Sequence, residues 1–379
     1  MRELLDASEV YVRLQNADGT LEPGWFGNRG AGALHSVPAS ENSAIEEQVF
    51  ARCAPATVED CSRLAVADPL WRKHGHAFVC PVFFQNKALG VLTAIRLETS
   101  TYFTAGQLSL IRVVADFLGI ARTTAGLQEE RQTEQRVLRG LEIAAEIQQS
   151  LLPKSFPISP NARIFGISQA AHEVGGDYFD AVQIGDKGVL LAIADVMGKG
   201  MPAALLATVL RTAIRARSDL AENPGRLLSE VNRQISSDLA KLDMFVTAQV
   251  AFFSYETKQL TFANAGHCPI LKLPRGEKRA VRLEASGIPL GVIDDVFYES
   301  TRHRVAPGDR FVFLTDGLYE VESATGEMLG LDRLTAQILE MHSSAPEEFC
   351  GELLDSVRSY SGNAQASDDR TILFLECLS

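Results

Sequence analysis

The chain has 379 residues, of which 46% are hydrophobic and 22% charged, and its formal net charge is −12. This length suggests roughly two to three domains, and the composition is that of a globular protein with a sizeable core. The acidic balance argues against nucleic acid as a partner and suits metal ions, small molecules or other proteins. Neither an apolar signal core nor an apolar run of membrane-spanning length is present, so we expect a cytoplasmic protein without a membrane partner.

The cysteines are scattered and show no paired spacing. In a chain of this size, such cysteines are typical of reduced core residues rather than of a zinc site or a disulfide framework. The six residues concerned are Cys53, Cys61, Cys80, Cys268, Cys350 and Cys377.

Residues 1–122 are expected to form a first domain. Alternating apolar residues predict a strand over 10–14, and two longer runs predict strands over 78–84 and 89–97 that are joined by a tight hairpin. A helix is predicted over 106–121 from apolar residues on one face. This order, together with the segments Cys80-Pro81-Val82 and Leu89-Gly90-Val91-Leu92, Phe103 and the closing helix, resembles the C-terminal half of a GAF domain.

The GAF resemblance implies a sensor that binds a small molecule or a partner protein, and the alternative is a plain dimerisation or packing module. The chain starts at the first strand of this domain or just before it, so we expect the domain to be truncated at its N-terminus. Aromatic and histidine side chains are the candidates for a ligand pocket, although core or surface positions are the default for them. They are Trp25, Phe26, Trp71, His74 and His76.

Residues 123–155 are predicted to form a linker dominated by one helix over 123–152, which Pro153 ends. A heptad pattern places eight residues on one seam, and only about half of them are apolar, so a coiled coil here should be weak. We expect this linker to support a homodimer and to transmit the state of the sensor. The alternative is an ordinary linker helix. The seam consists of Leu127, Arg131, Glu134, Leu138, Leu141, Ala145, Gln148 and Leu152.

Residues 156–379 are expected to form the largest domain. Hairpin-spaced strands and separate long helices favour an α+β sandwich over alternating β-α-β units. Strands are predicted over 164–167, 179–184, 189–194, 245–253, 259–263, 311–314 and 371–376, and helices over 203–217, 224–239, 333–341 and 346–360.

Acidic residues stand at the ends of these predicted strands. Asp177 follows Gly175-Gly176, Asp195 ends the run 189–194, Asp316 follows 311–314, and Asp368-Asp369 precedes the last strand. If the last strand is antiparallel to its neighbours, these carboxylates meet at one edge and repel one another unless cations bind there. Oxygen ligands alone favour Mg²⁺ or Mn²⁺. A single aspartate of this kind is more often a turn or helix cap, but four such positions favour a metal site.

The motifs around these residues occur in the order seen in the SpoIIE/RsbU family of bacterial serine/threonine phosphatases, which belongs to the metal-dependent PPM superfamily. The resemblance implies a sandwich of two stacked antiparallel sheets with helices outside. It also implies removal of phosphate from a seryl or threonyl residue, often on an anti-sigma-factor antagonist. The motifs are Val174-Gly175-Gly176-Asp177-Tyr178, Asp195-Val196-Met197-Gly198-Lys199-Gly200, Asn264-Ala265-Gly266-His267-Cys268-Pro269, Pro289-Leu290-Gly291, Pro307-Gly308-Asp309-Arg310, Thr315-Asp316-Gly317-Leu318 and Asp368-Asp369-Arg370-Thr371, and the segment 144–153 is similar to the helix before the catalytic domain.

The same resemblance implies roles for individual residues at a centre of two Mn²⁺ or Mg²⁺ ions. Asp195 would bridge the ions, the Val196 carbonyl would assist, and Asp177 would hold one ion directly or through water. Asp316 and Asp368 would hold the other ion, and the neighbouring Asp369 is a less direct candidate. Two such ions, roughly 3.5–4 Å apart, would activate a water for in-line attack on phosphorus, with no phosphoenzyme.

Several assignments stay open at this point. His267 is a candidate catalytic residue that would protonate the leaving oxygen or orient a water, and the alternative is a turn histidine satisfied by backbone. Lys199 is a candidate phosphate ligand or a solvated turn residue, and His172 is a minor candidate. Two other functions compete with a phosphatase: a diguanylate cyclase-like enzyme, from the partial likeness of residues 175–179, and a catalytically inactive PPM-like binding module.

Overall fold

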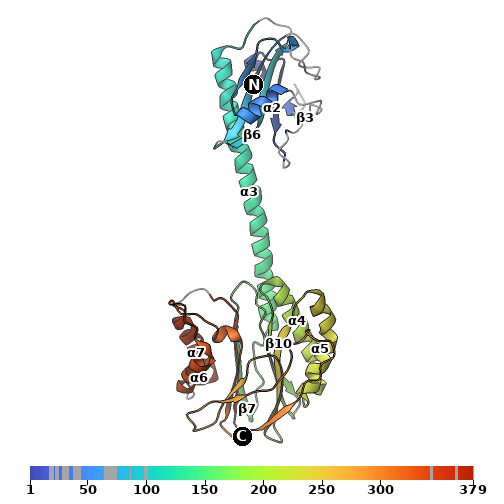
Figure 1. Ribbon diagram of the computed structural model, residues 1–379, viewed down its shortest axis with the longest axis vertical. Coiled ribbons are helices and arrows are strands. Elements are labelled where there is room, and N and C mark those ends of the chain that lie inside the picture. The colour runs from blue at the N-terminus through green and yellow to red at the C-terminus, as the bar shows by residue number, and fades with distance from the viewer. Residues whose placement is uncertain are drawn as a thin grey trace. The chain divides into compact units, whose positions relative to one another are not determined.

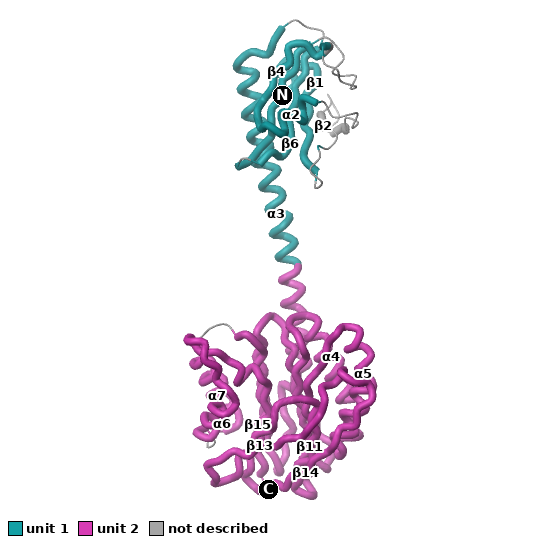
Figure 2. Tube along the Cα trace, in the orientation of Figure 1, with its two compact units in different colours: residues 1–136 teal, residues 137–379 magenta. Residues whose placement is uncertain are grey.

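The computed structural model describes residues 1–16, 21, 25–27, 34–36, 44–63, 75–85, 87–97, 101–341, 345–362 and 366–378. The chain divides into two compact units, residues 1–136 and residues 137–379 (Figure 2). Each unit has its own hydrophobic core.

The first unit is built on one antiparallel sheet with the strand order β3-β2-β1-β6-β5-β4. One face packs on the start of the long helix α3, and the other face packs on helix α2. The side chains of Trp25, Phe26, Trp71 and His74 lie outside the described residues, while His76 is buried. The elements are α1 (Arg2–Leu5), β1 (Glu9–Leu14), β2 (Trp25–Gly27), β3 (Leu34–Ser36), α2 (Ala44–Arg52), β4 (Ala56–Val58), β5 (Gly75–Phe84) and β6 (Lys87–Leu97).

Helix α3 (Ala105–Leu151) is a single helix of 47 residues, where the sequence predicted a domain helix over 106–121 and a separate linker helix over 123–152. The prediction of two separate helices was wrong because neither Arg122, which lies between them, nor the residues around it include a proline, and isolated glycines are tolerated inside a long helix. Exposed polar residues dominate its middle turns. Among the described residues, none of the helices combines the length and the apolar character that crossing a bilayer requires.

The second unit contains two five-stranded sheets, with the orders β14-β11-β10-β9-β8 and β13-β12-β15-β16-β7, and every paired strand is antiparallel to its neighbour. The strands are β7 (Ala162–Gln169), β8 (Tyr178–Ile184), β9 (Gly188–Val196), β10 (Val246–Ser254), β11 (Gln259–Ala265), β12 (Ile270–Leu273), β13 (Val281–Leu283), β14 (Thr301–Arg304), β15 (Arg310–Leu314) and β16 (Arg370–Cys377).

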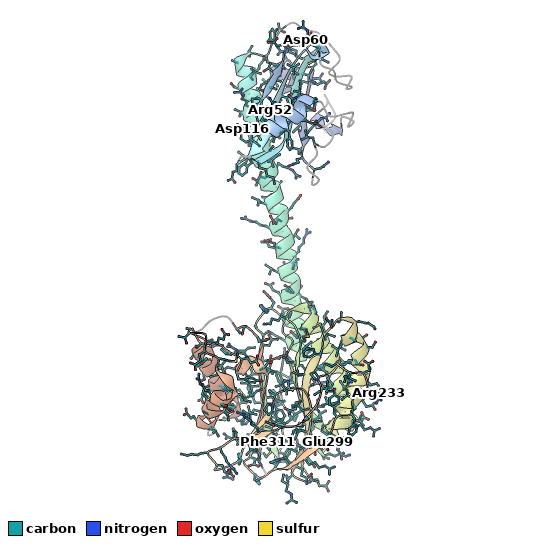
Figure 3. The ribbon with its side chains drawn as sticks, viewed as in Figure 1. Arg52, Asp60, Asp116, Arg233, Glu299 and Phe311 are labelled. Atoms are coloured by element: carbon teal, nitrogen blue, oxygen red, sulfur yellow. The ribbon has the colours of Figure 1, made fainter. Side chains whose placement is uncertain are left out.

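The two sheets stack on each other and carry a pair of helices on each outer face (Figure 1). Helices α4 (Met201–Ala216) and α5 (Pro224–Lys241) cover the first sheet, and α6 (Gly330–Glu340) and α7 (Pro346–Tyr360) cover the second. Aromatic and aliphatic side chains fill the layer between the sheets, including Phe311, which is labelled in Figure 3. The predicted α+β sandwich of two antiparallel sheets is therefore confirmed.

Candidate active site

Strand pairing brings the acidic segments to one edge of the sandwich. In the first sheet, Tyr178 at the start of β8 pairs with Ala194 near the end of β9. In the second sheet, Leu314 at the end of β15 pairs with Ile372 near the start of β16. Asp195 lies within β9, one residue before its end, rather than after a strand that stops at residue 194.

Asp177 is almost fully buried, with 5% of its surface exposed. Its carboxylate accepts a hydrogen bond from the Thr315 hydroxyl, with 2.8 Å between Oγ1 and Oδ2. The Thr371 backbone N–H donates to the same hydroxyl oxygen at 3.0 Å. Thr371 of the second sheet and Thr315, which directly follows its strand β15, thereby fix the carboxylate of Asp177, which directly precedes β8 of the first sheet.

Asp369 is engaged by the backbone of the glycine turn. One carboxylate oxygen accepts the Gly176 N–H at 2.6 Å and the Asp177 N–H at 3.4 Å, and the other accepts the Ala171 N–H at 2.8 Å. A Cβ at Gly175 would stand 2.5 Å from the same carboxylate, which is why this position requires glycine. These contacts favour Asp369 as a residue that positions the turn rather than as a direct metal ligand.

The Val196 carbonyl lies against the same turn. A Cβ at Gly176 would come within 2.8 Å of the Val196 oxygen, and the Val196 N–H donates to the Gly176 oxygen at 3.4 Å. The absence of a side chain at Gly176 therefore allows this carbonyl to lie beside Asp177, as the resemblance requires of a backbone ligand.

The carboxyl groups perturb one another. Burial, followed by the charges of Asp316 and Asp368, raises the pKa of Asp195 to about 7. Burial, followed by the charge of Asp195, raises the pKa of Asp177 well above its usual range. The pKa of Asp316 is raised by burial and then by Asp368. Asp195 thus interacts with both Asp177 and Asp316. A ligand shared by two metal ions would lie between two such groups.

A basic side chain, Lys199, lies beside the Asp368 end of this cluster. The Lys199 ammonium lies 3.6 Å from an Asp368 oxygen and donates a hydrogen bond to the Ser367 carbonyl. Its charge lowers the pKa of Asp316, although burial and Asp368 outweigh it. A single half-exposed lysine does not neutralise four carboxylates, so the edge retains a surplus of negative charge that favours binding of a cation.

The donor set fits hydrated divalent ions better than a closed protein cage. Within the described part of the chain, no three His, Cys, Asp or Glu side chains are arranged to enclose an ion by themselves. Mg²⁺ typically keeps several waters and takes only one or two carboxylates, and Mn²⁺ accepts the same ligands. Asp177, Asp195, Asp316 and Asp368, with the Val196 carbonyl, are the residues that could hold such ions.

His267 is satisfied within the fold. Its Nε2 lies 2.9 Å from the Leu314 carbonyl oxygen, and its Nδ1 lies 2.8 Å from the Thr247 hydroxyl. Because a carbonyl only accepts, Nε2 carries the proton in this assignment and Nδ1 accepts from Thr247. Burial lowers the pKa of His267 to about 4. These contacts favour the alternative of a structural turn histidine over a catalytic acid.

Several residues beside the carboxylates were not identified from the sequence. Thr315 supports Asp177, and its place next to Asp316 in a Thr-Asp-Gly motif was the available signal. Glu320 follows the short helical turn Asp316–Leu318, and burial and then Asp316 raise its pKa. Gln148 of α3 hydrogen-bonds to Gly175, a contact between residues 27 positions apart that no local pattern predicts.

Both units match known protein families. Residues 185–378 match the family described as Stage II sporulation protein E (SpoIIE), and residues 1–121 match the GAF domain. The chain is 31% identical over 255 residues to "Phosphoserine phosphatase RsbU" of Bacillus subtilis, a match that covers 67% of this chain and 73% of RsbU. It is 26% identical over 259 residues to "Protein IcfG" of Synechocystis, covering 62% of this chain and 40% of IcfG.

Two solved structures are similar to this chain in fold. The SiaA-PP2C domain of Pseudomonas aeruginosa is similar with a TM-score of 0.57 and 26% identity, covering 64% of this chain and 98% of that domain. The RsbU and RsbW domains of a Mycobacterium tuberculosis protein are similar with a TM-score of 0.53 and 25% identity, covering 60% of this chain and 63% of that one.

Proposed function

Because this chain belongs to the SpoIIE family of PP2C-type serine phosphatases and carries an N-terminal GAF domain, we propose that its second unit hydrolyses phosphoserine or phosphothreonine in a protein substrate. The observation that carries the proposal is the set of carboxylates at one edge of the sandwich, whose pKa values are raised by burial and by one another. Such an edge is stable with its groups ionised only when cations bind there.

We assign a role to each residue of this edge from its position in the cluster. Asp195 interacts with the groups on both sides and is proposed as the shared ligand, with Asp177 and the Val196 carbonyl on one side. Asp316 and Asp368 are proposed on the other side. Two divalent ions held there would lower the pKa of a water and so supply the nucleophile for attack on phosphorus.

Lys199 is proposed to meet the substrate phosphate. Its ammonium stands beside Asp368 with its side chain half exposed, so it can turn from the carboxylate to an incoming dianion without a change in the backbone. A lysine offers a mobile point charge for this purpose, whereas a bidentate arginine requires a fixed approach.

We propose that the substrate is a phosphorylated signalling protein of the anti-sigma-factor antagonist type, as expected from the resemblance to the RsbU family. The GAF domain would control the phosphatase by binding a small molecule or a partner protein. Helix α3 would support a homodimer, because Leu127 and Leu138 on its predicted seam are 53% and 51% exposed in the single chain.

A direct test is hydrolysis of phosphoserine and phosphothreonine peptides by the metal-free protein after addition of Mn²⁺ or Mg²⁺. We expect activity only with a divalent ion, and we expect Asp195→Asn to lower kcat/KM by ~10²–10³-fold because the central carboxylate is lost. Wild-type rates in the presence of a chelator, or in Asp195→Asn, would contradict the proposal.

The competing functions make different predictions. A diguanylate cyclase-like enzyme is not supported by the family match or by the two-sheet fold, and it would convert GTP to a cyclic dinucleotide. An inactive binding module would bind phosphorylated protein without releasing inorganic phosphate. Measuring phosphate release and GTP consumption on one preparation separates the three functions.

A further inference from the structure

The end of helix α3 is hydrogen-bonded to the turn that carries Asp177. The Gln148 side-chain N–H donates to the Gly175 carbonyl at 2.6 Å, and the Gly175 N–H donates to the Gln148 side-chain oxygen at 3.1 Å. One carboxamide therefore satisfies both backbone groups of one residue, as a neighbouring strand would. The pair of bonds fixes both the position and the orientation of Gly175.

The turn is held from its other side by Asp369. This carboxylate accepts the Gly176 N–H at 2.6 Å and lies where a Gly175 side chain would be. Residues 175 and 176 are thus clamped between Gln148 and Asp369, and Asp177 follows directly. Only one residue separates Gly175 from Asp177, so a shift at Gly175 strains the bonds that Asp369 makes to the Gly176 and Asp177 N–H groups.

Gln148 is partly buried between α3 and α4. The space between α3 and α4 near Asp177 has a volume of about 10 Å³, and Gln148, Leu151, Leu152 and Arg211 line it. The adjacent Gln149 is exposed. Because successive helix residues point about 100° apart, rotation of α3 by one residue would remove the carboxamide from Gly175.

We propose that Gln148 is a positioning residue for the phosphatase reaction. By holding the 175–177 turn, it presents Asp177 for divalent-ion binding, so the metal affinity of the site depends on the setting of the last turn of α3. This inference rests on the proposed function for its importance to activity, but the dependence of ion binding on Gln148 can be measured without turnover.

The test uses the full-length protein, stripped of metal and titrated with Mn²⁺ by isothermal calorimetry. Gln148→Leu keeps the size of the side chain and removes both bonds, and we expect about tenfold weaker Mn²⁺ binding, the effect of losing ~1.4 kcal/mol. Hydrogen exchange of the 175–177 amides should accelerate by a similar factor. At saturating Mn²⁺, kcat should stay within about twofold, because excess metal restores the bound state.

Two further variants make the result decisive. Gln149→Leu, the same change on the exposed neighbour, should leave Mn²⁺ affinity and hydrogen exchange unchanged. Gln148→Glu keeps an acceptor for the Gly175 N–H but opposes the Gly175 carbonyl, so it should also weaken Mn²⁺ binding, and it tests the proposal if the leucine variant does not fold. Wild-type Mn²⁺ affinity and wild-type exchange at residues 175–177 in the folded Gln148 variants would overturn the inference.

Failure of this inference is distinguishable from failure of the proposed function. Wild-type protein that binds Mn²⁺ in a Gln148-dependent manner but releases no phosphate from phosphoserine would refute the phosphatase and leave the clamp intact. A protein that releases phosphate but whose Mn²⁺ affinity does not depend on Gln148 would refute this inference and leave the proposed function intact.

Discussion

Asp195 has a pH dependence that follows from its neighbours. Burial and the charges of Asp316 and Asp368 raise its pKa to about 7, whereas in the unfolded chain a carboxyl has a pKa of about 4. Between these values, the folded protein holds a proton that the unfolded chain has released. The stability contributed by this proton is fully present below about pH 4 and is lost as the pH rises through about 7.

We therefore predict that metal-free Asp195→Asn protein is more stable than metal-free wild type at pH 8, and that the difference shrinks toward pH 5. A pKa change from about 4 to about 7 corresponds to about 4 kcal/mol. Because Asp195 is only partly buried, solvent screening should reduce the gain at pH 8 to on the order of 1–2 kcal/mol, or ~2–8 °C in Tm. Thermal unfolding with a chelator at a series of pH values measures it. Parallel curves for the two proteins at all pH values would show that the carboxyl is not perturbed.

His267 should matter for stability and little for chemistry. In His267→Ala, the partly buried Thr247 hydroxyl loses its partner, and the Leu314 carbonyl keeps only the bond from the Cys268 thiol, so we expect a cost of about 1–3 kcal/mol. We expect a lowered Tm and a kcat at saturating Mn²⁺ within about fivefold of wild type. A loss of 10²-fold or more in kcat with an unchanged Tm would restore His267 as a catalytic residue.

At the scale of elements, the glycine turn before β8 leaves no room for a side chain at residue 175. In Gly175→Ala, the new methyl group would stand 2.5 Å from an Asp369 oxygen, so either the turn or the carboxylate must move. We predict Mn²⁺ affinity at least tenfold weaker, measured by titration of the metal-free protein. The matched control is Gly351→Ala in α7, where no atom lies within 4 Å of the new Cβ and the variant should be neutral or slightly stabilised.

The main elements of the sandwich were predictable because their sequences carry long apolar runs. Residues 189–194 and 371–376 lie on central strands that are buried on both faces, so apolar periodicity marks them. Strand β14 was missed because Thr301-Arg302-His303-Arg304 has no apolar residue, and it forms only as an edge strand paired with β11. Its structure depends on the partner strand rather than on its own composition.

The sequence predicted which residue types form the candidate site but not which role each residue has. Asp368 and Asp369 are adjacent and chemically identical, and only the fold reveals that Asp369 faces the backbone N–H groups of the glycine turn. In the same way, Gln148 differs from Gln149 by one helical position, and the packing of α3 decides which of them reaches Gly175. Such distinctions arise from tertiary contacts over 27 to 198 residues of chain, for which a single sequence carries no signal.

At the scale of the whole molecule, α3 is the covalent connection between the GAF domain and the phosphatase unit, and the proposed control by the GAF domain would act through it. The helix is uninterrupted from Ala105 to Leu151. Gln148 belongs to the predicted two-chain seam and also binds Gly175 within one chain. If the predicted seam forms, it would need the same side chain that binds Gly175 in the single chain.

The seam itself is open to a matched test, because α3 exposes apolar residues both on it and away from it. Leu127 and Leu138 lie on the predicted seam, whereas Ile143, which is 52% exposed, lies outside it. Leu127→Glu and Leu138→Glu should weaken dimerisation at least tenfold in sedimentation equilibrium, because each places a pair of like charges between the helices. Ile143→Glu adds the same charge to the same helix and should leave the dimer intact. Equal effects of all three changes would mean that the helices do not pair along this seam.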